Sequence, residues 1–333
     1  MGVLHTMPRV VACCITSSIL GLGACGGVTR HPATQSIDTV DFACRLAVGS
    51  VPAGFGGFLS FPGGQFTSDP RSSRLYFSGP DTWVADSGVV SPDRLAYVRD
   101  DQIKVPQSTK IHVVDVVTGR DRAVWTEDAG GGSLSWQADG IYFLSVGGAD
   151  GPGPNIWVID PATGTQRLAV RQPAFGSGPE LFKAGAAVGG GAVWSTAGPL
   201  IRVNPVSGKS DTWADYQHGA FDVIGWDTSG QTLVALSGGS LVRLVGPNRS
   251  EAIQADGFRP PLGIPTGAIS DKHGTWAVAA DGSIWLLNTP TRMKRVAQVP
   301  LPTPPAPSPM PSGLLDDMGG SQVPRLLVAG PCV

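Results

Sequence analysis

Short hydrophobic runs bounded by polar turn residues recur along the chain, and the clearest example runs from Ile156 to Leu168. Its first four residues are apolar, as in a strand, Gly164 closes a tight turn, and the residues after the turn read as a second strand that returns beside the first. The stretch therefore predicts a hairpin of two antiparallel strands. Four further stretches show the same pattern: Ile111–Val124, Leu200–Trp213, Leu241–Ile253 and Ile284–Val299.

The five predicted hairpins are evenly spaced along the chain. The residues before their turns are Asp115, Asp160, Asn204, Val245 and Asn288, which gives successive spacings of 45, 44, 41 and 43 residues. A period in the low forties that is built only of short strands is typical of the blades of a β-propeller, each of which is a four-stranded antiparallel sheet. The sequence therefore predicts an all-β fold, a β-propeller.

Tryptophan positions support the repeat. Trp136 and Trp226 each end a stretch that reads as the innermost strand of a blade, and they lie 226−136=90 residues apart, which is about two periods. Eight of the nine tryptophans fall at equivalent positions of different blades. We expect their rings to fill the gap between neighbouring blades.

Five blades can be assigned, at residues 82–126, 132–171, 183–214, 221–255 and 265–299, and the first of them begins with Thr82–Asp86. A hairpin at Gly57–Phe66, a strand at Arg74–Ser78 and a last strand at Val323–Ala329 remain. Together they predict one more blade, which is made from both ends of the chain, closes the ring and leaves no exposed edge strand. The prediction is six blades, with seven as the alternative, because the boundaries near residues 57–90 are blurred.

Composition agrees with one domain over residues 51–333, although 333 residues would suffice for two ordinary domains. A hydrophobic content of 41% argues against disorder, and a net charge of −2 without basic clusters argues against nucleic acid as a partner. Seven prolines within 300–311 predict an extended connector rather than a strand. No segment after residue 30 approaches the roughly 18–20 apolar residues of a membrane span.

Residues 1–24 read as an export signal, with Arg9 followed by an uncharged and mostly apolar run that ends in small residues. Leu22-Gly23-Ala24-Cys25 resembles the bacterial lipobox, and this resemblance implies that Cys25 becomes the first residue of the mature chain and carries lipid. A plain signal peptide with an incidental cysteine is the alternative, and either Met1 or Met7 is the start. Residues 25–50 are then expected to be a flexible tether.

The cysteine count also fits an exported protein. Cys13 and Cys14 lie in the predicted signal and Cys25 is assigned to lipid, so Cys44 and Cys332 remain. An even remainder in an oxidising compartment predicts a disulfide between them. Because a propeller brings its termini together, this bridge would lock the ring where it closes. Two unrelated free thiols are the alternative.

Two turn motifs resemble a known family. Ser91-Pro92-Asp93, and the Asp-x-x-Thr-Gly phrases at 115–119 and 160–164, resemble the TolB-type six-bladed propeller repeats over about residues 57–330. The resemblance implies a part in envelope integrity and protein docking. TolB has an additional N-terminal α/β domain, and the residues between Cys25 and Gly57 are too few to form one.

Motifs that carry chemistry are absent from the sequence. Beyond the predicted signal, the histidines are His31, His112, His218 and His273, and no pair of them has metal-ligand spacing. The sequence contains no Cys-x-x-Cys, no Gly-x-Ser-x-Gly and no phosphate-binding glycine loop. Residues 270–276 approach the Asp-box of sialidases but miss its spacing, so we interpret them as a structural turn. We predict no catalytic residue, no metal and no cofactor.

The long loops are expected to carry any binding, because loops on a rigid scaffold usually do. In a propeller, the loops that join neighbouring blades, and the loops between the second and third strands, emerge on one face. Here these loops are Arg99–Lys110, Gly147–Asn155, Arg171–Phe182, Asp215–Ala220 and Asp256–Ile264. The candidate binding residues on them are Asp100, Asp101, Arg171, Glu180, Asp215, Tyr216, His218 and Arg259. Each of them taken alone could equally be solvated surface.

These observations lead to one functional prediction and two alternatives. The prediction is a monomeric, non-enzymatic propeller, held outside the cytoplasm at the cell envelope by lipid on Cys25, that binds an envelope protein or another ligand through its long-loop face. The first alternative is an exported hydrolase, lactonase or sugar-active enzyme with acidic residues at the mouth of the channel. The second alternative is a purely structural propeller.

Overall fold

The structure is a computed structural model in which the chain divides into two compact units, Met1–Thr34 and Gln35–Val333. All described residues belong to the second unit, and they are 36–85, 89–104, 107–146, 154–171, 186–195, 199–214, 221–236, 239–260, 267–301 and 324–333. These residues form strands and turns, and no helix occurs among them. The same residues accordingly contain no helix that could span a membrane.

Four sheets are four-stranded meanders of consecutive antiparallel strands. The first two are β9 (Gly130–Gln137), β10 (Gly140–Val146), β11 (Asn155–Ile159) and β12 (Gln166–Arg171), and then β13 (Ala186–Gly189), β14 (Ala192–Ser195), β15 (Leu200–Val203) and β16 (Ser210–Ala214). The other two are β17 (Phe221–Trp226), β18 (Thr232–Leu236), β19 (Leu241–Gly246) and β20 (Arg249–Ile253), and then β21 (Ile269–Asp271), β22 (Gly274–Val278), β23 (Ser283–Leu287) and β24 (Met293–Gln298).

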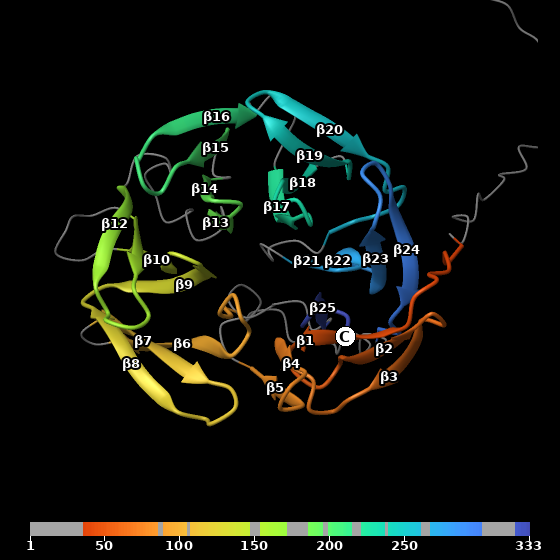
Figure 1. The fold of residues 1–333 in the computed structure, drawn as a ribbon, viewed down its shortest axis with the longest axis horizontal. Helices are drawn as coiled ribbons and strands as arrows, with labels where there is room; N and C mark the ends of the chain where they lie inside the picture. Colours follow the sequence, from red (N-terminus) through yellow and green to blue (C-terminus); the bar gives the residue numbers. More distant parts are fainter. Residues whose placement is uncertain are drawn as a thin grey trace, which may run out of the picture. The chain divides into compact units, whose positions relative to one another are not determined.

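The remaining strands form three sheets near the chain ends. One is four-stranded, in the order β25 (Arg325–Val328), β1 (Cys44–Val51), β2 (Gly57–Phe61) and β3 (Gln65–Ser68). The second is the hairpin of β4 (Leu75–Phe77) and β5 (Thr82–Val84), and the third contains β6 (Ala96–Lys104), β7 (Gln107–Asp115) and β8 (Asp121–Glu127). Within the unit Gln35–Val333, Figure 1 shows the sheets following one another around a common centre, as in a β-propeller.

The first and the last strand of the described chain pair with each other. β1 and β25 are antiparallel, with Val48 opposite Val328, and β1 also pairs with β2. Cys44 and Cys332 form the disulfide expected from the sequence, with their Cα atoms 5.5 Å apart. Beside this bridge, the backbone N–H of Arg45 donates to the carbonyl of Val333 at 2.7 Å. The two ends of the described chain are thus joined in one sheet.

Strand β1 corrects two predictions from the sequence. The third N-terminal strand of this sheet was expected at Arg74–Ser78, and residues up to 50 were expected to be tether. Instead, Cys44–Val51 is the strand, and five consecutive residues from Leu46 to Ser50 are buried. No turn phrase of the repeat follows this strand in the sequence, so the signal on which the prediction depended was missing.

Two assignments around the first predicted blade also differ. Thr82–Val84 was expected to start that blade, but it pairs with Leu75–Phe77, and among the described residues an isolated bridge joins Val90 to Tyr97 of β6. The predicted loop Arg99–Lys110 is the hairpin of β6 and β7, which remain paired as far as Lys104 and Gln107. Polar residues on both strands concealed this pairing in the sequence.

The turns behave as the sequence indicated. Asp115 Oδ1 accepts hydrogen bonds from the backbone N–H groups of Val117 (3.1 Å) and Thr118 (2.7 Å), and Gly119 has a φ of 69°. Hydrogen bonds from the Thr118 backbone and hydroxyl hold the pKa of the Asp115 carboxyl below its usual value. Asp160 and Gly164 repeat this turn. The Asp-x-x-Thr-Gly phrase therefore forms a structural turn at both sites.

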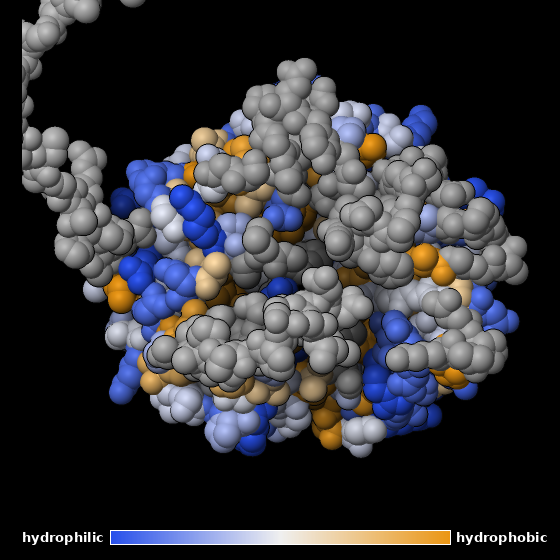
Figure 2. All heavy atoms as spheres, turned by 180° about the vertical axis from the view of Figure 1, so that it is seen from behind, coloured by the Kyte–Doolittle hydropathy of each residue, from blue (hydrophilic) through white to orange (hydrophobic). Residues whose placement is uncertain are grey.

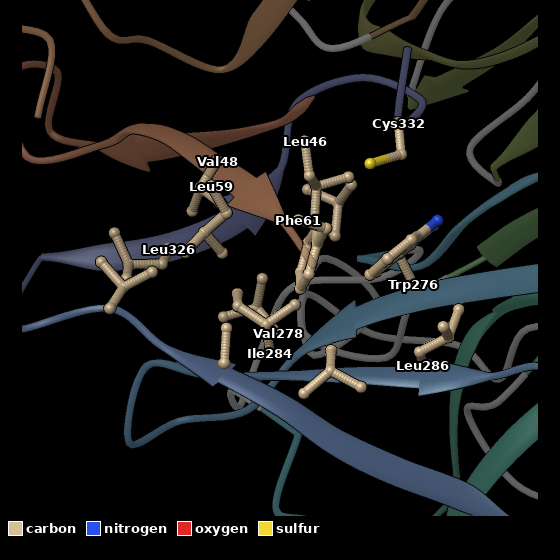
Figure 3. Close-up of a cluster of buried hydrophobic side chains, with 14 residues drawn as sticks. Leu46, Val48, Leu59, Phe61, Trp276, Val278, Ile284, Leu286, Leu326 and Cys332 are labelled. Atoms are coloured by element: carbon tan, nitrogen blue, oxygen red, sulfur yellow. The ribbon is translucent and has the colours of Figure 1, made fainter. Parts of the chain in front are cut away.

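Hydrophobic side chains fill the space between successive sheets. Figure 3 shows the largest such cluster, in which side chains of β1, β2 and β25 face side chains of β22 and β23. Leu46, Leu59 and Trp276 in this cluster are fully buried. Burying a leucine-sized side chain contributes about 1.5–3 kcal/mol, so the cluster stabilises the contact between the sheet that holds both chain ends and its neighbour.

Tryptophans contribute to this packing between sheets, as expected. Trp125 of β8 meets Phe143 of β10 with ring centroids 5.0 Å apart. The ring of Trp226 in β17 covers Gly189 of β13 so closely that a Cβ there would lie 2.4 Å from the ring. Glycine at position 189 is thus required by the neighbouring sheet.

Arginines add polar links between successive sheets. In three sheets, an arginine guanidinium donates to the carbonyl of a proline in the turn between the last two strands of the following sheet. The pairs are Arg122 with Pro161 (2.6 Å), Arg167 with Pro205 (2.8 Å) and Arg243 with Pro290 (2.6 Å). Arg122 and Arg167 hold equivalent places in the last strands of their sheets, whereas Arg243 reaches its proline from the third strand, β19.

Replacing both bridged cysteines, Cys44→Ser with Cys332→Ser, is expected to destabilise the protein. The bridge encloses 288 residues of sequence separation. For so long a loop, the chain-entropy description gives about 5–6 kcal/mol as an upper figure, since measured values are often smaller. Urea unfolding of the two proteins measures the difference. Dithiothreitol should shift the unfolding midpoint of the parent protein and leave the variant unchanged, and equal midpoints for parent and variant without reductant would contradict the expectation.

Candidate functional site

A polar groove lies between the β17–β20 sheet and the β21–β24 sheet. It has a volume of about 570 Å³ and is lined by the turns after β17, β21 and β23. In an antiparallel meander, the turns after the first and third strands lie at one end of the sheet. The turn after the second strand and the link to the next sheet lie at the opposite end. The groove is therefore at the other end of the sheets from the predicted long-loop face. Its lining residues are Asp227–Ser229, Gln231, Arg243, Asp271–Gly274 and Leu287–Pro290.

The floor of the groove is a buried ion pair. The side chains of Asp227 and Arg243 are 6% and 9% exposed, and Arg243 Nε donates to Asp227 Oδ2 at 2.5 Å. Asp227 Oδ1 also accepts the Ser229 hydroxyl at 2.6 Å and the Gln231 backbone N–H at 3.0 Å. Burial by itself would raise the pKa of the Asp227 carboxyl, but these hydrogen bonds outweigh burial and the pKa lies below its usual value. The pair is a fixed part of the scaffold.

Asp271 forms one wall of the groove and holds the C-terminus. Its Oδ2 accepts the Trp276 indole N–H at 2.8 Å and the Cys332 backbone N–H at 2.7 Å. Its Oδ1 accepts the backbone N–H of His273 at 2.7 Å. The interpretation of residues 270–276 as a structural turn agrees with these contacts. Asp271 thus connects the groove to the disulfide-bonded end of the chain.

His273 stands beside Asp271 with its ring position fixed by stacking. The ring is 4.0 Å from that of Phe42 and nearly parallel to it, at 17°. Its Nε2 is buried and has no hydrogen-bond partner among the described residues. Four exposed side chains around it also have no partner within that part of the chain: Thr228, Gln231, Lys272 and Asn288. The rim of the groove therefore presents polar groups that the protein itself does not use.

A second cluster of charged groups lies on the sheet β6–β8. His112 Nδ1 is 2.8 Å from Asp121 Oδ1, and its Nε2 is 3.4 Å from Asp101 Oδ2. Arg99 pairs with both carboxylates, at 3.1 Å from Asp101 and 2.7 Å from Asp121. Burial by itself would raise the pKa of Asp121, but His112 and Arg99 outweigh it and hold the pKa lower. Asp101 is therefore part of a network within one sheet.

Asp100 also has a structural contact. Its carboxylate accepts the Ser133 backbone N–H at 2.8 Å and the Ser133 hydroxyl at 2.7 Å, which ties β6 to β9. Asp100 and Asp101 were expected on a long loop, and they lie in strand β6 instead.

Among the other candidate binding residues, Arg171 and Arg259 are described. Arg171 is the exposed last residue of β12, and Arg259 is exposed and donates to the carbonyl of Phe258 at 2.9 Å. Cys25, Glu180, Asp215, Tyr216 and His218 lie outside the described residues. Figure 2 shows hydrophilic residues over much of the described rim of one face, with smaller hydrophobic areas between them. Within the described residues, the candidate residues do not come together in one site.

The groove was not predicted, although one signal pointed to it. Arg243 interrupts an otherwise hydrophobic strand, Leu241–Gly246, and a buried arginine needs a carboxylate partner. Asp227, which follows Trp226 at the equivalent end of the sheet, was the available partner. The unpartnered groups of the rim have no such sequence signal, because exposed lysine, asparagine and glutamine occur on every protein surface. No group of His, Cys, Asp and Glu side chains among the described residues is arranged to hold a metal ion.

Comparisons with known proteins concern only the fold. No protein-family model and no curated protein matches the sequence. Among solved structures, the chain is similar to TolB from Acinetobacter baumannii, with a TM-score of 0.41, 14% identity, and coverage of 72% of this chain and 62% of that one, less than two thirds of its length. It is also similar to the β-propeller domain of the Trilobed protease from Pyrococcus furiosus, with a TM-score of 0.40, 16% identity, and coverage of 63% and 69%.

Replacing Asp227 by Asn is expected to lower the free energy of unfolding by about 3–5 kcal/mol at pH 7, because a buried guanidinium loses its buried counter-charge and keeps only the exposed Glu251 at 3.5 Å. The lowered pKa of Asp227 means that its contribution is present above the pKa of the unfolded chain and is lost as the pH falls through the folded value. The difference between the variant and the parent should therefore shrink below about pH 4.

The matched control is Asp139→Asn, because Asp139 pairs with Arg167 at 2.5 Å but both side chains are more than 40% exposed. An exposed pair contributes at most about 1 kcal/mol. Urea unfolding at several pH values measures both variants. Equal losses for the two variants at pH 7 would contradict the assignment of Asp227 as a buried structural anion.

Proposed function

We propose that this chain is an exported, lipid-anchored β-propeller that binds an envelope protein or another ligand. The observation that carries the proposal is the Cys44–Cys332 disulfide, because such bonds persist in oxidising compartments outside the cytoplasm. The bridge also complements the sequence of residues 1–25, which resembles a lipoprotein signal. Two independent features of the chain thus agree on export.

We further propose that the sheets close into a ring of seven positions, the alternative count from the sequence. The shared sheet of β25 and β1 supports closure, and so does the packing of that sheet against β22 and β23. The two-stranded sheet β4–β5 is covered on both sides: Tyr76 packs with Phe58 of β2, and Phe77 with Tyr97 of β6. A hairpin buried in this way occupies the place of a reduced blade, whereas six positions would leave it unassigned.

The tether limits how far the propeller can lie from its membrane. The first described residue is Ser36, which is 36−25=11 residues after Cys25. A fully extended chain spans at most about 3.3–3.6 Å per residue, so these residues reach about 36–40 Å. With lipid on Cys25, the fold would be held within this distance of the bilayer surface, which suits a partner at or near that surface.

The predicted long-loop face is the proposed binding surface. The connections that follow β12 and β20 belong to it; the exposed Arg171 precedes the first connection, and the exposed Arg259 lies within the second. Their guanidinium groups can pair with carboxylates of a partner. Asp100 and Asp101 are omitted from this surface, because they are engaged in contacts within the scaffold.

Replacing Cys25 by Ser tests the anchor. We expect the parent protein in the membrane fraction of the producing bacterium and the variant in the soluble fraction, because the variant has no thiol to acylate. Mass spectrometry of the N-terminal peptide should show acyl chains on Cys25 of the parent. The matched controls Cys13→Ser and Cys14→Ser should leave both results unchanged. A parent chain that is soluble and begins at another residue would contradict the anchor.

Cross-linking in the same membranes tests the binding role. We expect one protein to be recovered reproducibly with the anchored chain, and we expect Arg171→Glu together with Arg259→Glu to reduce its recovery several-fold, because these changes reverse the charge of the proposed surface. Lys209→Glu, on a turn at the other end of its sheet, is the matched control. Recovery that is unaffected by the arginine changes, or turnover of a lactone or glycoside without any partner, would contradict the role.

A further inference from the structure

The two carboxylates of the groove between the β17–β20 and β21–β24 sheets already accept hydrogen bonds from the protein itself. Asp227 Oδ1 accepts from Ser229 and Gln231, and its Oδ2 accepts from Arg243. Asp271 accepts three N–H groups through its two oxygens. Both carboxylates thus have structural roles within the fold. Two cations and two carboxylates give the lining a formal charge of zero. The carboxylate oxygens, however, already accept hydrogen bonds from groups of the protein.

The donors of the groove are in the opposite situation. The ammonium of Lys272 is exposed and has no partner among the described residues. Arg243 donates through Nε to Asp227 and through Nη1 to Pro290 and, at 3.5 Å, to Glu251, and no bond from its Nη2 occurs within the described part of the chain. The amide groups of Gln231 and Asn288 are exposed on the rim. The groove therefore offers more open N–H groups than open acceptors.

His273 adds a buried group that calls for a partner. Its Nε2 is buried without a hydrogen bond to any described residue, and its ring stacks on that of Phe42. An unsatisfied buried polar atom in a folded protein usually has a water molecule, an ion or a ligand as its partner. Nε2 donates a hydrogen bond when it carries the proton, so a partner at that buried position would be an acceptor.

We propose that this groove binds a small ligand through a carboxylate, which is held by Lys272 and Nη2 of Arg243 and lies beside the ring of His273. A carboxylate supplies four acceptor positions and one negative charge, which matches open donors around a fixed cation. The volume of about 570 Å³ is in the range of small-molecule sites. The amides of Gln231 and Asn288 would contact further polar groups of the ligand. This site depends neither on the lipid anchor nor on the long-loop face, so it can fail or hold independently of the proposed function.

The test uses the histidine ring signals in the NMR spectrum of the full chain carrying Cys25→Ser. The sequence has only five histidines, and His273→Gln assigns one Cε1–H signal. The probe is glutarate, and its neutral diamide glutaramide is the matched control ligand. We expect glutarate to shift the His273 signal saturably at millimolar concentration, glutaramide to leave it in place, and the His112 signal to be unaffected by both.

Two lysine variants make the test specific. Lys272→Ala should weaken glutarate binding by about tenfold, because a hydrogen bond to a charged group is lost. Lys209→Ala removes an exposed lysine from the corresponding end of another sheet and should have no effect. Unchanged His112 signals in both variants show that the fold is retained. The proposal is overturned if about 50 mM glutarate does not move the His273 signal, which excludes even weak binding. It is equally overturned if glutaramide shifts the signal as much, or if Lys272→Ala binds as tightly as the parent.

Discussion

The pairing of β1 with β25 is the contact on which the rest of this fold depends. Every other sheet is built from strands that are close in sequence, and it can form from local hairpins. The first sheet alone needs both ends of the chain, across a separation of 288 residues between its bridged cysteines. Contacts so distant in sequence are entropically costly to make, and the covalent bond at Cys44 and Cys332 offsets that cost. The hydrophobic cluster of Leu46, Leu59 and Trp276 then packs this sheet on its neighbour.

Successive sheets are joined in two ways that complement each other. Apolar side chains fill the space between them, which is a strong but non-directional attraction. The arginine-to-proline contacts add direction, because a guanidinium reaches a carbonyl oxygen only when the following sheet is in register. Arg243 has both duties: it crosses to Pro290 of the next sheet, and it neutralises Asp227 within its own. The groove forms where these contacts leave polar groups of the turns without an internal partner.

The sequence revealed the repeated part of this fold and missed the parts that are not repeated. Turn chemistry and spacing located the hairpins at Asp115, Asp160 and Asn204, because each turn has its own residue pattern. β1 was missed because no turn phrase of the repeat follows it. The groove was missed for another reason. Lys272 and Asn288 line it together with residues more than 40 positions away, such as Asp227, and no local sequence pattern predicts that they come together.

The docking of the N-terminal segment has a mechanical consequence. The backbone N–H of Asp38 is bonded to the carbonyl of Arg295, Phe42 packs against His273 and Trp276, and Cys44 follows directly. A force that pulls the chain ahead of Ser36 first loads these few contacts and then reaches the sulfur–sulfur link. Beyond that point the force is shared between β1 and β25. Residues 45–331 lie inside a loop closed by the disulfide, so the force cannot extend them. A pulling force on the N-terminal segment therefore does not unfold the residues between the two cysteines.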